Sequence, residues 1–192
     1  MPRISPTSTS ADATVTAVLN DMKARMGRAP NFVTTIAQSP ASFNSYIAFS
    51  KALMNGRLTA RQRESLALAV AQANSCQYCL SAHTASSKRA GFSDADILKA
   101  RTGKSDNAHD NAVLTFALKA VQQKGLVSDA DIASAREAGI DDGLMLEIVA
   151  NIALNTLTNY TNRLAGTEID FPVVQVALEV PGRPFEEKIY AD

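Results

Sequence analysis

Apolar residues between Ala41 and Phe171 form Ala- and Leu-rich runs that glycines interrupt at intervals. No segment there alternates apolar and polar residues over enough positions to demand a strand. None of the seven prolines falls in this interval. Because glycine commonly follows the last residue of a helix, the runs between glycines predict helices. Their expected ranges are 12–25, 41–55, 60–73, 76–90, 94–101, 107–124, 129–138 and 143–165.

Polar residues at the expected helix starts agree with these ranges. Thr59 precedes "ARQRESLALAVAQA", and Ser93 and Ser128 each precede "DADI" with an aspartate at the third helical position, which is a variant of the capping box. We therefore predict an all-α fold in one domain over residues 11–172. A flexible leader at 1–10 and a tail at 173–192 flank it, and "FPVVQVALEV" near the tail could be extended.

A faint internal repeat relates two of the predicted helical segments. "ESLALAVAQANSCQYC" and "EIVANIALNTLTNYTN" have similar apolar patterns but low identity. A duplicated helical unit is one interpretation, and chance similarity of Ala-rich helices is the other. The register pairs Glu64 with Glu147, Cys76 with Asn159 and Cys79 with Asn162.

Charge and hydropathy exclude several classes of protein. Nineteen basic and nineteen acidic residues cancel, so no global field favours nucleic acid or an acidic membrane surface. No apolar run is long enough for a membrane span. The N-terminal "MPRISPTSTSADATV" lacks the apolar core of a signal peptide, so we expect a cytoplasmic protein.

Two predicted helices are apolar around much of their circumference. They carry "FNSYIAFSKALM" and "LMLEIVANIALNTL". A helix that is apolar on all sides must be buried, and a chain of 192 residues offers limited room for several such helices. We therefore predict a homo-oligomer.

The candidate chemistry lies in "CQYCLSAHTASSKRAG", which holds both cysteines of the chain. With Ser75 as the expected N-cap, Cys76 and Cys79 fall in the first turn of a helix, where unpaired N–H groups and the helix dipole favour a thiolate. His83 follows Cys79 by four residues, so the imidazole can reach that sulfur most directly. We expect Cys76, at the helix start, to lie nearer solvent and an external reductant.

Glu64 joins this group only if the chain turns. A straight helix would separate it from Cys76 by roughly 18 Å. With a turn at Asn74–Ser75, the helices on either side fold together, and a partly buried Glu64 can orient His83 and accept a proton.

Other interpretations of these residues remain open. A structural zinc site needs four ligands, and the two cysteines with His83 supply three, with Glu64 or His109 as a possible fourth. The cysteines could also be inert core residues. A thioredoxin-like motif needs a βαβ context that is missing. We expect His109 to be exposed near a helix start.

The spacing of Glu64, Cys76, Cys79 and His83 resembles the signature of the AhpD-like alkylhydroperoxidases within the carboxymuconolactone decarboxylase family. The lead-in "GRAPNFVTTIAQSPASF" resembles that of the family, and the later "TNYTNRLAGTEIDFP" resembles the end of its peroxidase-related subgroup. The resemblance runs from about Gly27 to Pro172. One departure is Tyr78, since AhpD proteins carry a histidine directly before the second cysteine.

The resemblance implies an all-helical fold with an internal duplication, a homo-oligomer, and a thiol peroxidase without haem, flavin or metal. It implies that Cys79 is oxidised to sulfenic acid, and that Cys76 donates a proton and then closes the disulfide. Glu64 and His83 would form the proton relay. Decarboxylase chemistry is disfavoured, because the lactone decarboxylases do not depend on a CxxC pair.

We therefore predict a cytoplasmic antioxidant enzyme that reduces hydroperoxides through a Cys76–Cys79 dithiol/disulfide cycle. Its electrons would come from an external dithiol of lipoyl or thioredoxin type. One alternative is a disulfide reductase that serves another peroxidase. Another is a redox-sensing or metal-binding oligomer without turnover.

Overall fold

The computed structural model describes residues 1–177, and within them it contains nine helices and no strand. The helices are α1 (Ala13–Met26), α2 (Asn31–Ile36), α3 (Pro40–Met54), α4 (Ala60–Ala73), α5 (Gln77–Arg89), α6 (Asp94–Arg101), α7 (Ala108–Gln122), α8 (Asp129–Glu137) and α9 (Asp142–Ala165). The predicted all-α class is confirmed. All eight expected helices are present, with ends within two residues of their predicted positions.

The short helix α2 was not predicted. It has only six residues, and Pro30 at its N-cap makes no side-chain capping hydrogen bond. An isolated helix of this length is unstable, so its formation depends on packing. Phe32, Val33 and Ile36 supply that packing, because all three are buried.

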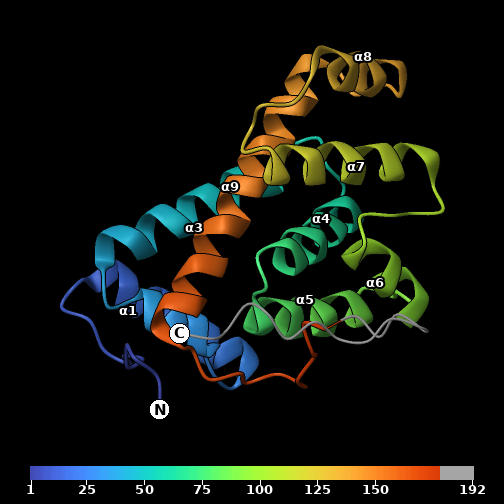
Figure 1. Cartoon of the computed structure of the whole chain (residues 1–192). Coiled ribbons are helices and arrows are strands. Elements are labelled where there is room, and N and C mark those ends of the chain that lie inside the picture. Colours follow the sequence, from blue (N-terminus) through green and yellow to red (C-terminus); the bar gives the residue numbers. More distant parts are fainter. Residues whose placement is uncertain (178–192) are drawn as a thin grey trace.

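Helix α4 lies at the centre of the fold and packs against α5, α6, α7 and α9 (Figure 1). All six residues from Leu66 to Ala71 are buried, as expected for a helix that is apolar on every side. One core cluster joins α4 to α1, α2 and α5, and a second joins it to α7, α8 and α9. The long α9 crosses the molecule, beginning near α8 and ending near α1.

The predicted caps on three helices are confirmed. The side chains of Thr59, Ser93 and Ser128 each accept a hydrogen bond from the backbone N–H of the third helical residue. The side chain of that third residue in turn accepts one from the backbone N–H of the cap residue. These local bonds define where α4, α6 and α8 begin.

The predicted leader contacts the helical body. The amides of Arg3 and Ile4 both donate to the Ala165 carbonyl, at 2.7 and 3.1 Å, and the Thr7 amide donates to the Thr34 carbonyl. The first residues of the predicted tail have no regular structure, and the Val174 amide donates to Ser81 Oγ on α5. The rest of that tail, and of "FPVVQVALEV", lies outside the described residues. Over residues 1–177, no helix has both the length and the apolarity that crossing a bilayer requires.

Candidate active site

The chain turns between α4 and α5, as the proposed site requires. Helix α4 ends at Ala73, and Ser75 adopts a positive φ of 52°. The expected N-cap at Ser75 is wrong: Cys76 is the N-cap of α5, and its sulfur accepts a hydrogen bond from the Cys79 amide at 3.3 Å. Ser75 cannot cap the helix because its left-handed backbone is used to reverse the chain. The reversal lets α4 and α5 pack side by side.

Cys76 and Cys79 form a disulfide, with their Cα atoms 5.3 Å apart. Both are buried, with exposed fractions of 1% and 3%. Exposed fraction therefore does not separate the two sulfurs, but Cys76 lines a cavity formed with the end of α9 and the residues that follow it, and Cys79 is not among the residues that line it. The pair lies at the N-terminal end of α5, where the helix dipole favours negative charge on sulfur.

Glu64 and His83 meet across the α4–α5 interface. His83 Nδ1 lies 3.0 Å from Glu64 Oε2, and Ser86 Oγ donates to Glu64 Oε1 at 3.3 Å. Both side chains are half-buried. Burial by itself raises the pKa of Glu64, but His83, Ser86 and Arg89 together outweigh it and hold the pKa below its ordinary value. Glu64 is therefore a carboxylate at neutral pH and suits a proton acceptor.

Two separate cavities flank this region. The Glu–His cavity has a volume of about 430 Å³ and is lined by Glu64, His83 and Ser86, with Asn151 and Asn155 of α9 on another wall. The cysteine cavity has a volume of about 590 Å³ and is lined by Cys76, Tyr78 and residues from the end of α9. Among the described contacts, His83 makes no hydrogen bond to either sulfur. The structure thus brings the four predicted residues onto two adjacent helices but shows the acid–base pair and Cys76 in different cavities.

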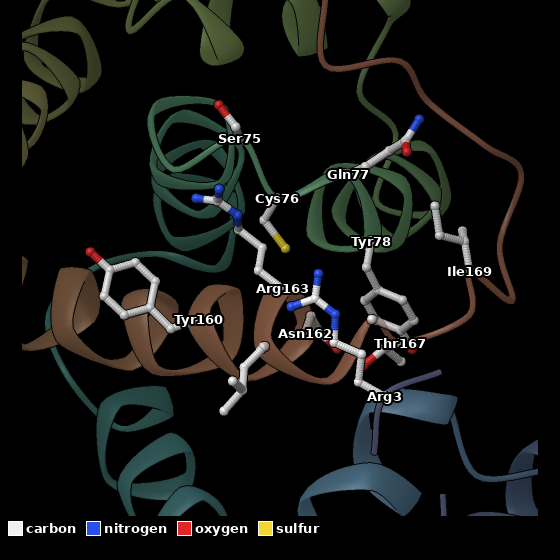
Figure 2. A pocket seen from close by; sticks show the side chains of 12 residues that line it. Arg3, Ser75, Cys76, Gln77, Tyr78, Tyr160, Asn162, Arg163, Thr167 and Ile169 are labelled. Atoms are coloured by element: carbon white, nitrogen blue, oxygen red, sulfur yellow. The ribbon is translucent and has the colours of Figure 1, made fainter. Parts of the chain in front are cut away.

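The cysteine cavity is positively charged. Figure 2 shows the Cys76 sulfur pointing into it, with the side chains of Arg163 and Arg3 nearby. Arg163 is held there by a hydrogen bond of 2.9 Å to the Asn74 carbonyl. The described lining residues include these two arginines and no carboxylate. Such a wall favours an anionic or carboxylate-bearing molecule next to the disulfide.

Tyr78 does not take the place of a second relay histidine. Its hydroxyl donates to Asp170 Oδ1 at 2.9 Å and accepts from the Phe32 amide at 3.0 Å. Burial, together with the Asp170 carboxylate, raises the pKa of Tyr78 far above its ordinary value, although the Phe32 N–H and Arg28 act the other way. The phenol therefore stays protonated and serves to tie α5 to α2 and to the segment after α9.

A row of buried asparagines on α9 was missed by the sequence analysis. Its members are Asn151, Asn155, Asn159 and Asn162. The Asn162 amide nitrogen lies 3.5 Å from Cys79 Sγ, and Asn159 accepts a hydrogen bond from Asn74. Their spacing, which puts all four on one helical face, was the available signal. The repeat register also pairs Asn162 with Cys79, and the structure places these two positions in contact.

The internal duplication itself stays a prediction. In the first copy, the chain is split by the turn at Ser75 into α4 and α5, whereas the second copy lies within the uninterrupted α9. Glu147, the counterpart of Glu64, serves a structural purpose: its carboxylate accepts from the amides of Arg57 and Leu58, both at 2.8 Å.

His109 lies apart from the cysteines. It is partly buried rather than exposed, and its Nδ1 lies 3.0 Å from the Ala138 carbonyl, so it joins the start of α7 to the end of α8. Over residues 1–177, no three His, Cys, Asp or Glu side chains gather as a metal ion would require.

Comparisons with known proteins agree with this arrangement. Residues 40–123 match the model of the carboxymuconolactone decarboxylase family, and this segment contains both cysteines, Glu64 and His83. A search of curated proteins found no match for the chain.

Several solved structures resemble most of the chain. The AhpD core of an uncharacterized peroxidase-related protein from Ralstonia eutropha JMP134 aligns with a TM-score of 0.78 at 26% identity, over 88% of this chain and 92% of that one. An uncharacterized peroxidase-related protein from Silicibacter sp. TM1040 aligns with a TM-score of 0.72 at 23% identity, over 85% and 91%. The debrominase Bmp8, solved with 2,3,4-tribromopyrrole, aligns with a TM-score of 0.71 at 19% identity, over 87% and 91%. The chain thus has an AhpD-like fold, and its residues 40–123 match the model of the carboxymuconolactone decarboxylase family.

Proposed function

We propose that this protein is a thiol-dependent peroxidase that reduces hydroperoxides through a Cys76–Cys79 dithiol/disulfide cycle. The observation that carries the proposal is the Glu64–His83 pair, at 3.0 Å, on the two helices that position the disulfide. A base that is oriented by a carboxylate can activate a nucleophilic cysteine, and His83 lies on α5 four residues after Cys79. Such an enzyme would act in antioxidant defence in the cytoplasm.

The oxidative half of the cycle uses both thiols. The Glu64–His83 pair takes the proton of the Cys79 thiol, and the thiolate attacks one oxygen of the hydroperoxide. The O–O bond breaks, Cys79 becomes a sulfenic acid, and the departing alkoxide takes the proton of Cys76. The Cys76 thiolate then attacks the Cys79 sulfur, and the relay returns its proton to the hydroxide that leaves as water. One hydroperoxide and two thiols thus yield an alcohol, water and the disulfide.

The reductive half requires an external dithiol. Its first thiolate attacks Cys76, which faces the cysteine cavity, and releases Cys79 as a thiolate. Its second thiol then attacks the sulfur that is bound to Cys76, which closes the dithiol's own disulfide, breaks the mixed disulfide and releases Cys76 as a thiol. Arg3 and Arg163 favour a reductant with a carboxylate. We expect dihydrolipoate to reduce the protein faster than neutral dihydrolipoamide, and Arg163→Gln to narrow that difference.

A peroxidase assay with a lipoyl dithiol tests the proposal directly. Wild type should consume hydroperoxide catalytically, and Cys79→Ser should not. Treatment of Cys76→Ser with one equivalent of hydroperoxide, followed by a dimedone-type probe, should label Cys79, whereas Cys79→Ser should show almost no label on Cys76. Comparable labelling of Cys76 in Cys79→Ser would reverse the two roles.

The alternatives predict different results in the same assay. A disulfide reductase would oxidise the dithiol in the presence of a disulfide substrate but would not consume hydroperoxide. A redox sensor would form the disulfide once without turnover, and a metal-binding protein would contain zinc after purification without chelator. Any of these outcomes, without peroxide turnover, would replace the peroxidase proposal.

A further inference from the structure

Asn162 on α9 has an unusual environment for a buried asparagine. Its exposed fraction is 5%, and its side chain donates from Nδ2 to Cys79 Sγ at 3.5 Å. Within the described residues, its Oδ1 is buried without a partner. Buried amides are normally hydrogen-bonded on both sides, whereas among the described residues the contact with Cys79 is the one polar contact that this side chain makes.

The geometry points to Asn162 as a further residue of the reacting site: its amide stabilises the Cys79 thiolate. The assignment rests on the proposed thiol chemistry and names a group that the Glu64–His83 pair does not supply. A disulfide sulfur is a weak acceptor, whereas a thiolate is a strong one, so the same amide contact gains strength when Cys79 acquires charge.

The contact bears on both halves of the cycle. When a dithiol thiolate attacks Cys76, the S–S bond breaks and its electron pair goes to Cys79 Sγ. A donor already directed at that atom lowers the energy of the leaving thiolate and so speeds its release. The same donor keeps Cys79 ionised before it meets the hydroperoxide.

Asn159 provides a matched control on the same helix. It is also buried, one turn earlier on the asparagine face, but its described hydrogen bond is to Asn74 and not to sulfur. Asn159→Ala and Asn162→Ala therefore both remove a buried amide from one face of α9, and only the second removes a donor to Cys79.

The test titrates the thiol of Cys79 in full-length Cys76→Ser protein, where it is the only thiol, by ultraviolet thiolate absorbance. Asn162→Ala should raise the titration midpoint by about one to two pH units, the size expected for the loss of a hydrogen bond to a charged group. Asn162→Asp, which keeps the volume but replaces the donor with a carboxylate, should raise it further. Asn159→Ala should leave it unchanged.

An unchanged midpoint in Asn162→Ala would overturn the assignment, as would an equal rise in Asn159→Ala. If Asn162→Ala does not fold, Asn162→Asp tests the assignment in its place, because an unchanged midpoint of the Cys79 thiol in that variant also overturns the assignment. No hydroperoxide is used, so the result is separate from the proposed function. If Asn162→Ala raises the midpoint but wild type does not turn over hydroperoxide, the role of Asn162 stands and the peroxidase proposal fails. If wild type turns over hydroperoxide but the midpoint in Asn162→Ala is unchanged, the peroxidase proposal stands and the role of Asn162 fails.

Discussion

At the scale of single residues, the decisive contact is the one between Glu64 and His83. Each carries an acid–base group, and the turn at Ser75 brings them to 3.0 Å. A general acid–base group contributes about 10²–10⁴-fold to the rate. We therefore predict that Glu64→Gln and His83→Ala each lower peroxidase turnover by about that factor while the helical content persists.

Glu147→Gln is the control for this prediction. Glu147 pairs with Glu64 in the repeat register but binds the amides of Arg57 and Leu58 and lies outside the Glu–His cavity. The peroxidase turnover of Glu147→Gln, per folded molecule, should match that of wild type. Full activity in both Glu64→Gln and His83→Ala would remove the pair from the mechanism.

Glu64 also makes stability depend on pH. Because its pKa is lowered in the folded protein, the ionised carboxylate stabilises the fold above the ordinary pKa of glutamate, roughly 4.3, and this contribution is lost as the pH falls through the folded-state value. The difference in unfolding free energy between wild type and Glu64→Gln should therefore shrink as the pH falls from about 5 to about 3. Urea unfolding of both proteins measures it, and a difference that grows toward acid pH would contradict the direction of the pKa.

At the scale of elements, α5 is fixed to its surroundings through Tyr78. The phenol joins α5 to the amide of Phe32 in α2 and to the Asp170 carboxylate, and Asp170 is also bound by Arg28. The ring packs edge-on against Phe171 at 5.8 Å between centroids. This network positions the first turn of α5, which carries both cysteines.

Tyr78→Phe should therefore lower stability and not turnover. Removing the hydroxyl leaves a buried amide and a carboxylate with fewer partners, which costs about 1–3 kcal/mol of unfolding free energy. Chemical unfolding measures this loss, and peroxidase turnover at a temperature where the variant stays folded should remain near that of wild type. A large loss of turnover in folded Tyr78→Phe would show that the phenol takes part in proton transfer.

At the scale of the whole molecule, α9 leaves an apolar stripe on the surface. Its members are Leu146, Val149, Ala153, Leu157, Tyr160 and Leu164, all exposed. Their spacings of three or four residues place them on one helical face, as in a seam that packs against another helix. Tyr160 and Leu164 also line the cysteine cavity, so a partner on this stripe would cover one of its edges.

We predict that the protein is a homo-oligomer that buries this stripe. Leu146 and Leu164 are 71% and 65% exposed, and the double substitution Leu146→Glu/Leu164→Glu should reduce the mass measured by light scattering. Leu98→Glu is the control, because Leu98 is 51% exposed on another helix, α6. A monomeric wild type at micromolar concentration would contradict the prediction.

The sequence by itself determined eight of the nine described helices and singled out four candidate site residues. Helix starts at Thr59, Ser93 and Ser128 were predictable because each cap depends on residues within three positions along the chain. The spacing from Cys76 to His83 was informative for the same reason, since one helix places these side chains on one face.

Tertiary structure alone decided the rest. Helix α2 exists because the core buries its apolar residues. Cys76 and not Ser75 is the N-cap of α5, because the chain reverses its direction at Ser75. The contacts of Tyr78 with Asp170 and of Cys79 with Asn162 join residues 92 and 83 positions apart. Such contacts depend on how whole helices pack, and no local pattern of residues encodes the distance between two side chains on different helices.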